Sequence, residues 1–343
     1  MHLFKQQGLS GEEQSRTPIP VIDLGRYLAG EPGAIEAAAA ELRRASEEVG
    51  FFYVSNHGVS EDLVEHAFQA SQAFHALPME EKLSIKVNEN NIGYLPMAGS
   101  LAASSTVHKN TKPNLNESFF ITHDRETDHP GVVAGEPLRS ANQWPPSAPD
   151  GMRETMVSYY RAVHGLADRL VTLFAASLDL PPNWFDAAFA NESNATIRFI
   201  HYPPQEVIEE NQFGSAPHTD NSFLTILART EVPGLAVRLT NGKWFIPPLI
   251  PGTFLVNLGN ILRRWSNDTY LSTPHGVVND SGKDRYSIAF FHNPNPQAVI
   301  APVPTRVTPE HPAQHEPALY LDLALAFYRA NYLHQKRPAE VGV

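Results

Sequence analysis

The feature that most restricts the fold of this 343-residue chain is a series of short β-type segments that begins after Asn194. Pro, Gly and Asn separate the segments from one another, and the 29 prolines of the chain favour turns and sheet edges over a helical bundle. The segments are 196–202, 213–218, 223–229, 235–239, 243–246, 253–258, 270–278 and 285–292. Short strands at this spacing predict a β-sandwich or a β-barrel.

The first half of the chain and its last part have helical patterns instead. A helix is predicted for 32–49, where Gly50 provides the C-terminal stop, and another for 60–78. A third helix is predicted for 150–178, and 317–335 returns to helical spacing. The predicted fold class is therefore α+β, with a mainly β core, packed N-terminal helices and a C-terminal helix.

No internal repeat and no clear linker divides the chain, so the expected boundaries follow changes of pattern. Two short strands, 19–24 and 51–54, lie among the N-terminal helices, and the segments 86–118 and 123–150 have little periodicity. The expected units are a flexible arm (1–17), an N-terminal helical and mixed region (18–149), a long supporting helix with its connection (150–193), the β core (194–300), and a C-terminal helix and tail (301–343).

Composition excludes several classes of function. The net charge is −11 and no Lys/Arg-rich run exists, so the basic face that nucleic-acid binding needs is not expected. The chain has no cysteine, which excludes disulfides and Cys-ligated metal sites and leaves His, Asp, Glu or backbone oxygen as metal ligands. No apolar stretch is long enough for a membrane span and no signal core is present, so we expect a cytoplasmic location and no membrane partner.

Two histidines and an aspartate are candidate metal ligands. His218 and Asp220 precede a strand-like run that ends at Leu227, and residues two apart on a strand point to the same face. A surface turn before a strand is the alternative for so short a motif. His275 lies in another predicted strand, and two His with one carboxylate on neighbouring strands leave three octahedral positions open, as in non-haem Fe(II) oxygenases.

An arginine and a serine follow ten residues later and share one strand face. The guanidinium of Arg285 fits a carboxylate in bidentate geometry, and Ser287 adds a hydroxyl beside it. We therefore expect this pair to bind an anionic ligand beside the metal cavity. The alternative is an exposed arginine at the start of a strand, after the polar turn 279–284.

Several segments together resemble the isopenicillin-N-synthase-like family of Fe(II)/2-oxoglutarate-dependent oxygenases. The resemblance spans about residues 18–335, and the joint pattern is more specific than any one of its parts. The segments that carry it are 19–24, 50–58, 74–82, 217–227, 256–267, 272–275 and 285–291.

This resemblance implies a double-stranded β-helix, or jelly roll, with Fe(II) held by His218, Asp220 and His275. It also implies that Arg285 and Ser287 hold the distal carboxylate of the co-substrate 2-oxoglutarate. The segment 198–204 matches the family segment in which Asn and Tyr, two apart, approach the co-substrate. Tyr202 is the retained tyrosine, whereas Ile200 stands where Asn is common.

The implied activity is an oxidation, with hydroxylation as the expected outcome, of a small organic substrate. Oxygen would be consumed, and succinate and CO₂ would be released. Ile200 keeps open a 2-oxoglutarate-independent oxidase of the isopenicillin N synthase type, in which the Arg285 pair serves the substrate carboxylate. A non-catalytic jelly-roll module that binds metal or ligand is the third alternative.

The resemblance places the substrate pocket beside an irregular segment and several aromatic residues. Its expected borders are 90–116, 118–121, Phe213, Phe223, Phe327 and Asn331. His201 alternates with Ile200 and Tyr202, so it should point away from the cavity that they face. His57 and His292 are expected to be structural. The sequence predicts neither the substrate nor the oligomeric state.

Overall fold

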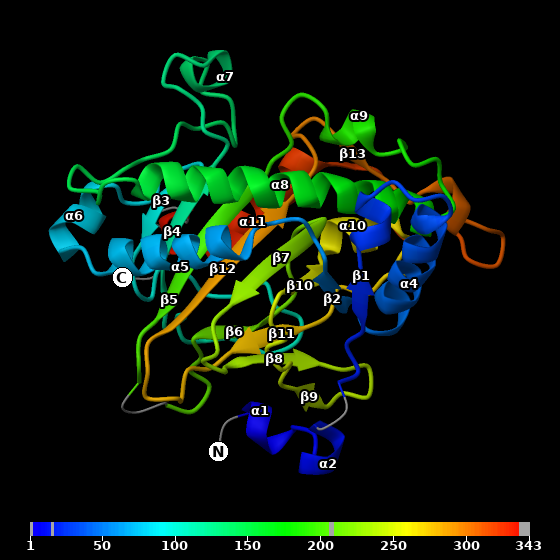
Figure 1. The fold of residues 1–343 in the computed structure, drawn as a ribbon, viewed down its shortest axis with the longest axis horizontal. Helices are drawn as coiled ribbons and strands as arrows, with labels where there is room; N and C mark the ends of the chain where they lie inside the picture. Colours follow the sequence, from blue (N-terminus) through cyan, green and yellow to red (C-terminus); the bar gives the residue numbers. More distant parts are fainter. Residues whose placement is uncertain (1–2, 15–16, 206–208, 336–343) are drawn as a thin grey trace.

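The computed structural model describes residues 3–14, 17–205 and 209–335, and shows the long helices packed on the larger of two main β-sheets (Figure 1). The strands are β1 (Val21–Asp23), β2 (Phe51–Ser55), β3 (Gly93–Leu95), β4 (Glu117–Thr122), β5 (Thr196–Tyr202), β6 (Ser215–His218), β7 (Leu224–Arg229), β8 (Leu235–Arg238), β9 (Trp244–Phe245), β10 (Phe254–Leu258), β11 (His275–Val277), β12 (Arg285–His292), β13 (Val299–Ile300) and β14 (Ala318–Leu319). The helices are α1 (Leu3–Gln6), α2 (Gly11–Gln14), α3 (Gly25–Leu28), α4 (Ala34–Glu48), α5 (Glu61–His75), α6 (Met79–Ser84), α7 (Pro130–Val133), α8 (Met152–Ser177), α9 (Asp186–Phe189), α10 (Asn260–Trp265) and α11 (Tyr320–Asn331), with 3-10 turns at Pro304–Arg306 and Leu333–Gln335.

The two main sheets form the predicted jelly-roll core. The larger sheet has the order β1-β2-β10-β7-β12-β5-β4-β3, and all of its neighbours except β1 and β2 run antiparallel. The smaller sheet has the order β6-β11-β8-β9 and is antiparallel throughout. The predicted α+β jelly roll is confirmed. Each predicted segment of the core contains a strand, although 270–278 is a strand only from His275, directly after Pro274, which has no N–H to donate.

Alternation along the strands separates two hydrophobic layers. Phe51 and Tyr53 of β2 belong to the cluster between the sheets, together with Leu235 and Val277 of the smaller sheet. The neighbouring Phe52 points the other way, into the larger cluster that contains the buried faces of α4, α5 and α8. Because successive strand side chains point to opposite faces, one strand supplies both layers. The larger sheet thus separates the cavity between the sheets from α4, α5 and α8.

Part of the predicted N-terminal arm is anchored to the smaller sheet. Residues 3–14 form α1 and α2, and Gly8 forms an isolated bridge with Trp244 of β9. The buried ring of Phe4 lies 4.6 Å from the ring of Trp244 and 5.6 Å from that of Phe213. Leu3 and Leu9 of the arm also pack against hydrophobic clusters, and the polar composition of the arm gave no sign of these contacts. The division of the rest of the chain into units stays a prediction, since β1 to β4 of the N-terminal half join the sheet of the core.

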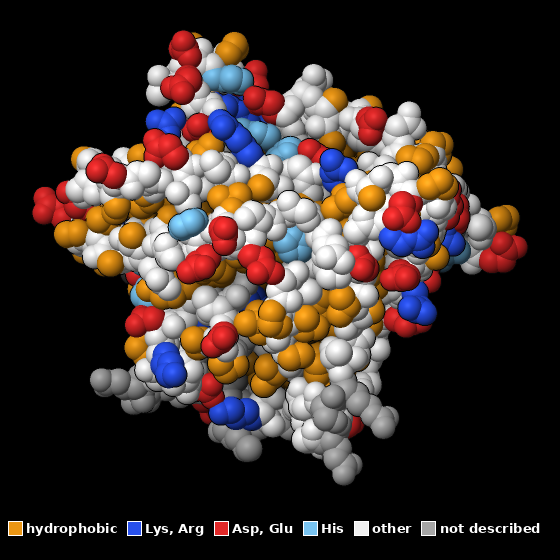
Figure 2. Space-filling model, viewed as in Figure 1, with side chains coloured by type: hydrophobic (Ala, Val, Ile, Leu, Met, Phe, Trp, Pro, Cys, Tyr) orange, Lys and Arg blue, Asp and Glu red, His pale blue; other side chains and the backbone are white. Residues whose placement is uncertain are grey.

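Charged side chains of both signs are interspersed on the face shown in Figure 2, and gather between α7 and α8. That gathering includes acidic Asp124 and Glu192 beside basic Arg125 and Arg161. Within the described ranges, every helix is too short or too polar to cross a lipid bilayer.

We predict that Gly50→Ala destabilises the fold more than Gly30→Ala does. Both glycines have a left-handed backbone, with φ of +71° and +70°, which costs any other residue about 1–2 kcal/mol. A Cβ at Gly50 would also lie 2.5 Å from the carbonyl oxygen of Leu271, whereas Gly30 has open space. Because of this close contact, Gly50→Ala should lower the free energy of unfolding by about 1–3 kcal/mol more than Gly30→Ala does. Urea denaturation measures both losses, and equal losses would contradict the prediction.

Candidate active site

Three side chains converge at one end of the smaller sheet. His218 is the last residue of β6, His275 is the first of β11, and the two are paired across the sheet. Their ring centroids lie 4.5 Å apart. Asp220 Oδ1 lies 3.5 Å from His218 Nε2 and 3.7 Å from His275 Nε2, so the structure brings the three predicted ligands together.

The expected local structure of this motif is wrong in one respect. Asp220 does not share a strand with His218, because β6 ends at His218 and β7 begins only at Leu224. The carbonyl oxygen of Asp220 instead accepts a hydrogen bond from the backbone N–H of Asn260, 2.8 Å away, at the start of α10. A turn held by this contact, and not strand alternation, directs the carboxylate at the two imidazoles.

Hydrogen bonds orient each of the three candidate ligands. His218 Nδ1 lies 2.7 Å from the carbonyl oxygen of Ala216, and His275 Nδ1 lies 3.1 Å from that of Thr273. A carbonyl can only accept, so Nδ1 carries the proton and the lone pair of each Nε2 faces Asp220.

Two further side chains hold the carboxylate. Asp220 Oδ2 accepts hydrogen bonds of 2.7 Å from Thr225 Oγ1 and from Asn257 Nδ2, which leaves Oδ1 for the histidine side. Sequence reasoning assigned no role to Thr225 or Asn257. Only the pairing of β7 with β10 reveals their role, because it places Asn257 opposite Thr225.

The electrostatics suit a divalent transition-metal ion. Burial lowers the pKa of His275 from 6.5 to about 4, so its imidazole is neutral at neutral pH. Burial by itself would raise the pKa of Asp220, but the adjacent His275 and His218 outweigh it and hold that pKa below its ordinary value. An ionised carboxylate beside a neutral imidazole and a second histidine is a donor set that Fe(II), Zn(II) and similar ions accept.

Arg285 is a buried cation without an acidic partner among the described residues. Its exposed fraction is 2%, and its Nε and Nη1 have no hydrogen-bond partner there. Its guanidinium carbon lies 4.7 Å from the centroid of the Tyr202 ring, which lies opposite Arg285 on β5. Ser287 is buried on the same face of β12. The alternative of an exposed arginine is therefore wrong, and the orphaned donors fit an anionic ligand.

A glycine makes room for this arginine. A Cβ at Gly234 would lie 3.1 Å from Arg285 Nε and 2.5 Å from the carbonyl oxygen of Val278. Val278 follows His275 by three residues, a span of about 10 Å along extended chain. Gly234 thus lets the segment that follows His275 approach the side chain of Arg285.

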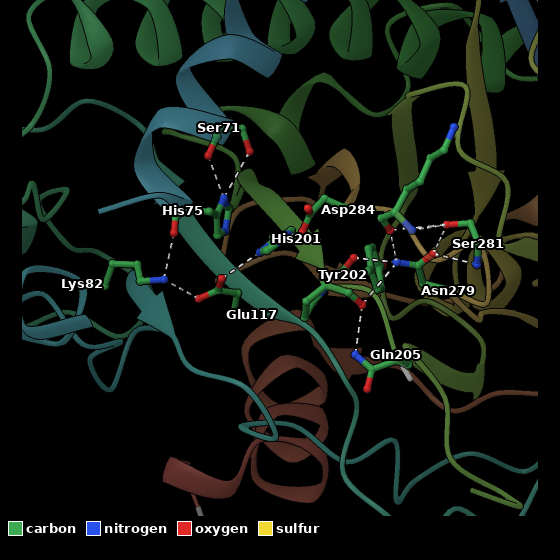
Figure 3. A network of polar contacts seen from close by, with 12 residues as sticks. Ser71, His75, Lys82, Glu117, His201, Tyr202, Gln205, Asn279, Ser281 and Asp284 are labelled. Atoms are coloured by element: carbon green, nitrogen blue, oxygen red, sulfur yellow. Dashed lines mark hydrogen bonds and ion pairs between the residues drawn. The ribbon is translucent and has the colours of Figure 1, made fainter. Parts of the chain in front are cut away.

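His201 points away from the cavity, as predicted, into a polar network on the other face of the larger sheet (Figure 3). Its Nδ1 lies 2.8 Å from Glu117 Oε1, and its Nε2 lies 2.7 Å from Asp284 Oδ1. Lys82 Nζ donates to Glu117 Oε2 at 2.9 Å, and the pair is almost fully buried. This network fixes β4, β5 and the start of β12 relative to one another, directly behind Tyr202 and Arg285.

The structure corrects part of the expected border of the substrate pocket. Phe223 is wrong, because its ring packs against Phe174 and Phe185 in the helix-covered core. Phe213 is wrong as well, since it packs on Phe4 beneath the arm. The cavity next to the candidate ligands is lined by Asn91, Ser100, Leu101, Ala102, Ser104, Ser105, Asn114, Phe120, Thr196, Arg198, Ser215, His218, Thr219, Asp220, Asn221, Ser222, Asn260, Phe291, Asn293, Phe327, Tyr328, Asn331 and Tyr332.

Arg198 is a cavity residue that sequence reasoning missed. Its Nε donates to Ser118 Oγ at 2.9 Å and its Nη2 to Asn116 Oδ1 at 2.8 Å, both neutral acceptors. Its guanidinium carbon lies 5.1 Å from the centroid of the Phe120 ring. The alternation that places Ile200 and Tyr202 on the cavity face of β5 also places Arg198 there, so the signal was available.

Comparisons with known proteins identify the family to which this chain is similar. Residues 19–147 match a family described as non-haem dioxygenase in morphine synthesis N-terminal, and residues 193–294 match the 2OG-Fe(II) oxygenase superfamily. A 2-oxoglutarate-Fe(II) type oxidoreductase of Emericella nidulans is 33% identical, with 92% of this chain and 91% of the relative covered. A homoarginine-6-hydroxylase of Glycine max is 31% identical, with 84% and 89% covered. A full-length Neurospora crassa protein solved in complex with alpha-KG and thymine is 28% identical, with a TM-score of 0.78 and 90% and 96% covered.

We predict that the contribution of His201 to stability falls as the pH rises. Burial by itself lowers the pKa of His201, but the hydrogen bonds with Glu117 and Asp284 outweigh it and raise that pKa above 6.5. A raised pKa in the folded state stabilises the fold fully below the unfolded pKa, and the stabilisation is lost as the pH passes the folded pKa. Urea denaturation should therefore show a larger loss in His201→Gln, relative to the wild type, at about pH 5.5 than at about pH 9. A loss independent of pH would contradict the ion-pair role.

Proposed function

This chain belongs to the 2OG-Fe(II) oxygenase superfamily, and from that premise we propose that His218, Asp220 and His275 hold the iron. Their three donor atoms lie within 4.8 Å of one another. Three ligands on one side of the ion leave three positions for O₂ and a bidentate keto acid. The observation that carries the proposal is that the other polar atom of each ligand is already engaged by a protein group.

The protein is an Fe(II)- and 2-oxoglutarate-dependent oxygenase, and the resemblance found in its sequence is confirmed. Fe(II) is its metal, and 2-oxoglutarate and O₂ are its co-substrates. When bound, the iron supplies the oxidation of 2-oxoglutarate by O₂ to succinate and CO₂ together with the oxidation of the substrate. This activity takes the place of the two alternatives, the 2-oxoglutarate-independent oxidase and the non-catalytic module.

We propose that Arg285, Ser287 and Tyr202 bind the distal end of 2-oxoglutarate. The buried guanidinium has donors without acceptors among the residues that the structure describes, and the hydroxyl of Ser287 lies on the same strand face. Tyr202 lies against the guanidinium and limits its positions. Ile200, which is buried between the sheets, offers no polar contact there, so the charged contact to Arg285 carries more of the affinity.

We predict that Arg285→Gln weakens 2-oxoglutarate binding by a factor of about 10 to 150, since hydrogen bonds to a charged group contribute about 1.5–3 kcal/mol. Anaerobic titration of the Fe(II)-loaded protein, followed by the visible metal-to-ligand charge-transfer band, measures the affinity. Arg238→Gln on β8 is the matched control and should titrate as the wild type does, because Arg238 hydrogen-bonds to Gly242 outside the cavity.

The same titration tests the proposed iron ligands. His275→Ala should give no charge-transfer band at any 2-oxoglutarate concentration, because keto-acid chelation needs bound iron. An undiminished band in His275→Ala would remove His275 as a ligand, and a wild-type affinity in Arg285→Gln would remove Arg285 from the co-substrate site.

We infer that the substrate is a small organic molecule with an acceptor oxygen that faces Arg198. No carboxylate of the described residues forms an ion pair with Arg198, so its charge is balanced only by neutral acceptors. Phe120, Phe291 and Phe327 give the cavity apolar walls. The solved neighbours include complexes with thymine and 5-formyluracil and a dioxygenase for auxin oxidation in rice. Hydroxylation at a C–H bond turned toward the iron is the proposed outcome.

We predict that Arg198→Met lowers substrate-stimulated succinate formation by about tenfold or more, while succinate formed without substrate stays unchanged. The reason is that the substitution removes the substrate contact and leaves the proposed co-substrate contacts intact. A panel of small carboxylates and neutral carbonyl compounds, assayed for stimulation, supplies the substrate. Arg263→Met, on the exposed side of α10, should behave as the wild type does. Unchanged stimulation in Arg198→Met would contradict this substrate contact.

Two further statements from the sequence stay predictions. The absence of cysteine agrees with a cytoplasmic location. The division into a dioxygenase N-terminal region (18–149), a supporting helix (150–193) and a jelly-roll core (194–300) is proposed as an organisation of the chain. Limited proteolysis at these boundaries measures whether the units separate.

A further inference from the structure

A second cluster of two histidines and one aspartate lies outside the candidate iron site. His164 and Asp168 are one turn apart on α8, and His292 is the last residue of β12. His164 Nδ1 lies 3.1 Å from Asp168 Oδ2, and His292 Nε2 lies 3.1 Å from Asp168 Oδ1. The three donor atoms lie within 4.8 Å of one another.

The larger sheet separates this cluster from the cavity between the sheets. Phe291 faces that cavity, and the next residue, His292, faces α8 on the other side. Figure 1 shows α8 lying along that covered face of the sheet. The second cluster is therefore built from elements that hold none of the candidate iron ligands, although its histidine adjoins the cavity wall.

The donor atoms of the two imidazoles are available to a cation. His292 has no exposed surface, and its Nε2 lies near Asp168 without the alignment of a hydrogen bond. His164 Nε2 lies 3.1 Å from Ser193 Oγ, so that contact engages Nε2 and leaves Nδ1 toward the carboxylate.

The carboxylate supplies the charge and the route of entry. Each of its two oxygens faces one imidazole, Oδ2 toward His164 and Oδ1 toward His292, both at 3.1 Å. The side chain of Asp168 is 51% exposed, so an ion and a water ligand can reach it from solvent.

We propose that His164, Asp168 and His292 form a second metal site, which binds Zn²⁺ and ties α8 to the end of β12. Two imidazoles and one carboxylate, with water in the fourth position, form a donor set that zinc accepts in tetrahedral geometry. Calcium and magnesium prefer oxygen ligands, so they fit this cluster poorly. The site assignment does not depend on the identity of the iron ligands.

The first test is the zinc stoichiometry of the full-length protein. After chelation, equilibrium dialysis against Zn²⁺ with elemental analysis should give one zinc fewer per chain for Asp168→Asn than for the wild type. Asp62→Asn, an exposed carboxylate on α5, is the matched control and should keep the wild-type value. Loss of one zinc supports the site, whether or not the candidate iron site also takes zinc. Equal stoichiometry in Asp168→Asn and the wild type would overturn the proposal.

The second test separates a lost ligand from a disturbed fold. Co²⁺ in a four-coordinate site absorbs far more strongly in the visible than Co²⁺ in a six-coordinate site. The wild type should show the strong band, and Asp168→Asn and His164→Gln should lose it while their circular dichroism and their 2-oxoglutarate titration stay unchanged. A strong band that persists in both variants would refute the second site.

Discussion

The carboxylate of Asp220 is the interaction on which the arrangement of the active site depends. Its Oδ2 is held by Thr225 of β7 and Asn257 of β10, which are neighbouring strands of the larger sheet. Its Oδ1 faces the two histidines of the smaller sheet. One side chain therefore connects the two layers of the jelly roll at the point where they open. A metal ion between Oδ1 and the imidazoles would join the sheets through ligands that are already oriented.

Strand alternation then assigns a different task to each face of the larger sheet. On β5, Arg198 faces the cavity and Tyr202 belongs to the cluster between the sheets, whereas His201 enters the network with Glu117 and Asp284. On β12 the same division separates Arg285 from the residues that face the helices. The charges that bind ligands and the charges that fix the strands thus sit on opposite sides of one sheet. Because the sheet lies between them, each set can be satisfied by its own partners.

Features of the sequence with a local physical cause were predictable. Gly50 ends a helix because its φ of +71° suits glycine, and the period of the β segments identified the core. The three candidate iron ligands and Arg285 were found from residue type, spacing and the family resemblance. The three candidate ligands converge in the structure, and Arg285 is buried. Arg198 was missed although the alternation used for His201 also places it in the cavity.

Other features depend on contacts between distant segments and had no local signal. The direction of Asp220 comes from a backbone hydrogen bond to Asn260, and Phe223 is removed from the cavity by packing against α8 and α9. Phe4 anchors the arm through Trp244, which lies 240 residues away along the chain. The spacing of residues within one segment does not predict such contacts, because each contact depends on a partner from a distant segment.

The buried donors of Arg285 that lack acceptors among the described residues link ligand binding to the stability of the fold. Arg229 is half-buried, and its guanidinium donates to the carbonyl oxygens of Pro247 and Pro248, so it stabilises the fold by itself. Within the described part of the chain, Arg285 has no such acceptors at Nε and Nη1, and an uncompensated buried charge costs about 3–5 kcal/mol when a partner is removed. A carboxylate ligand that supplies the missing acceptors offsets part of this cost and so stabilises the folded state. Ligand binding at Arg285 and stability are thus linked, because the folded chain alone offers the complete set of contacts.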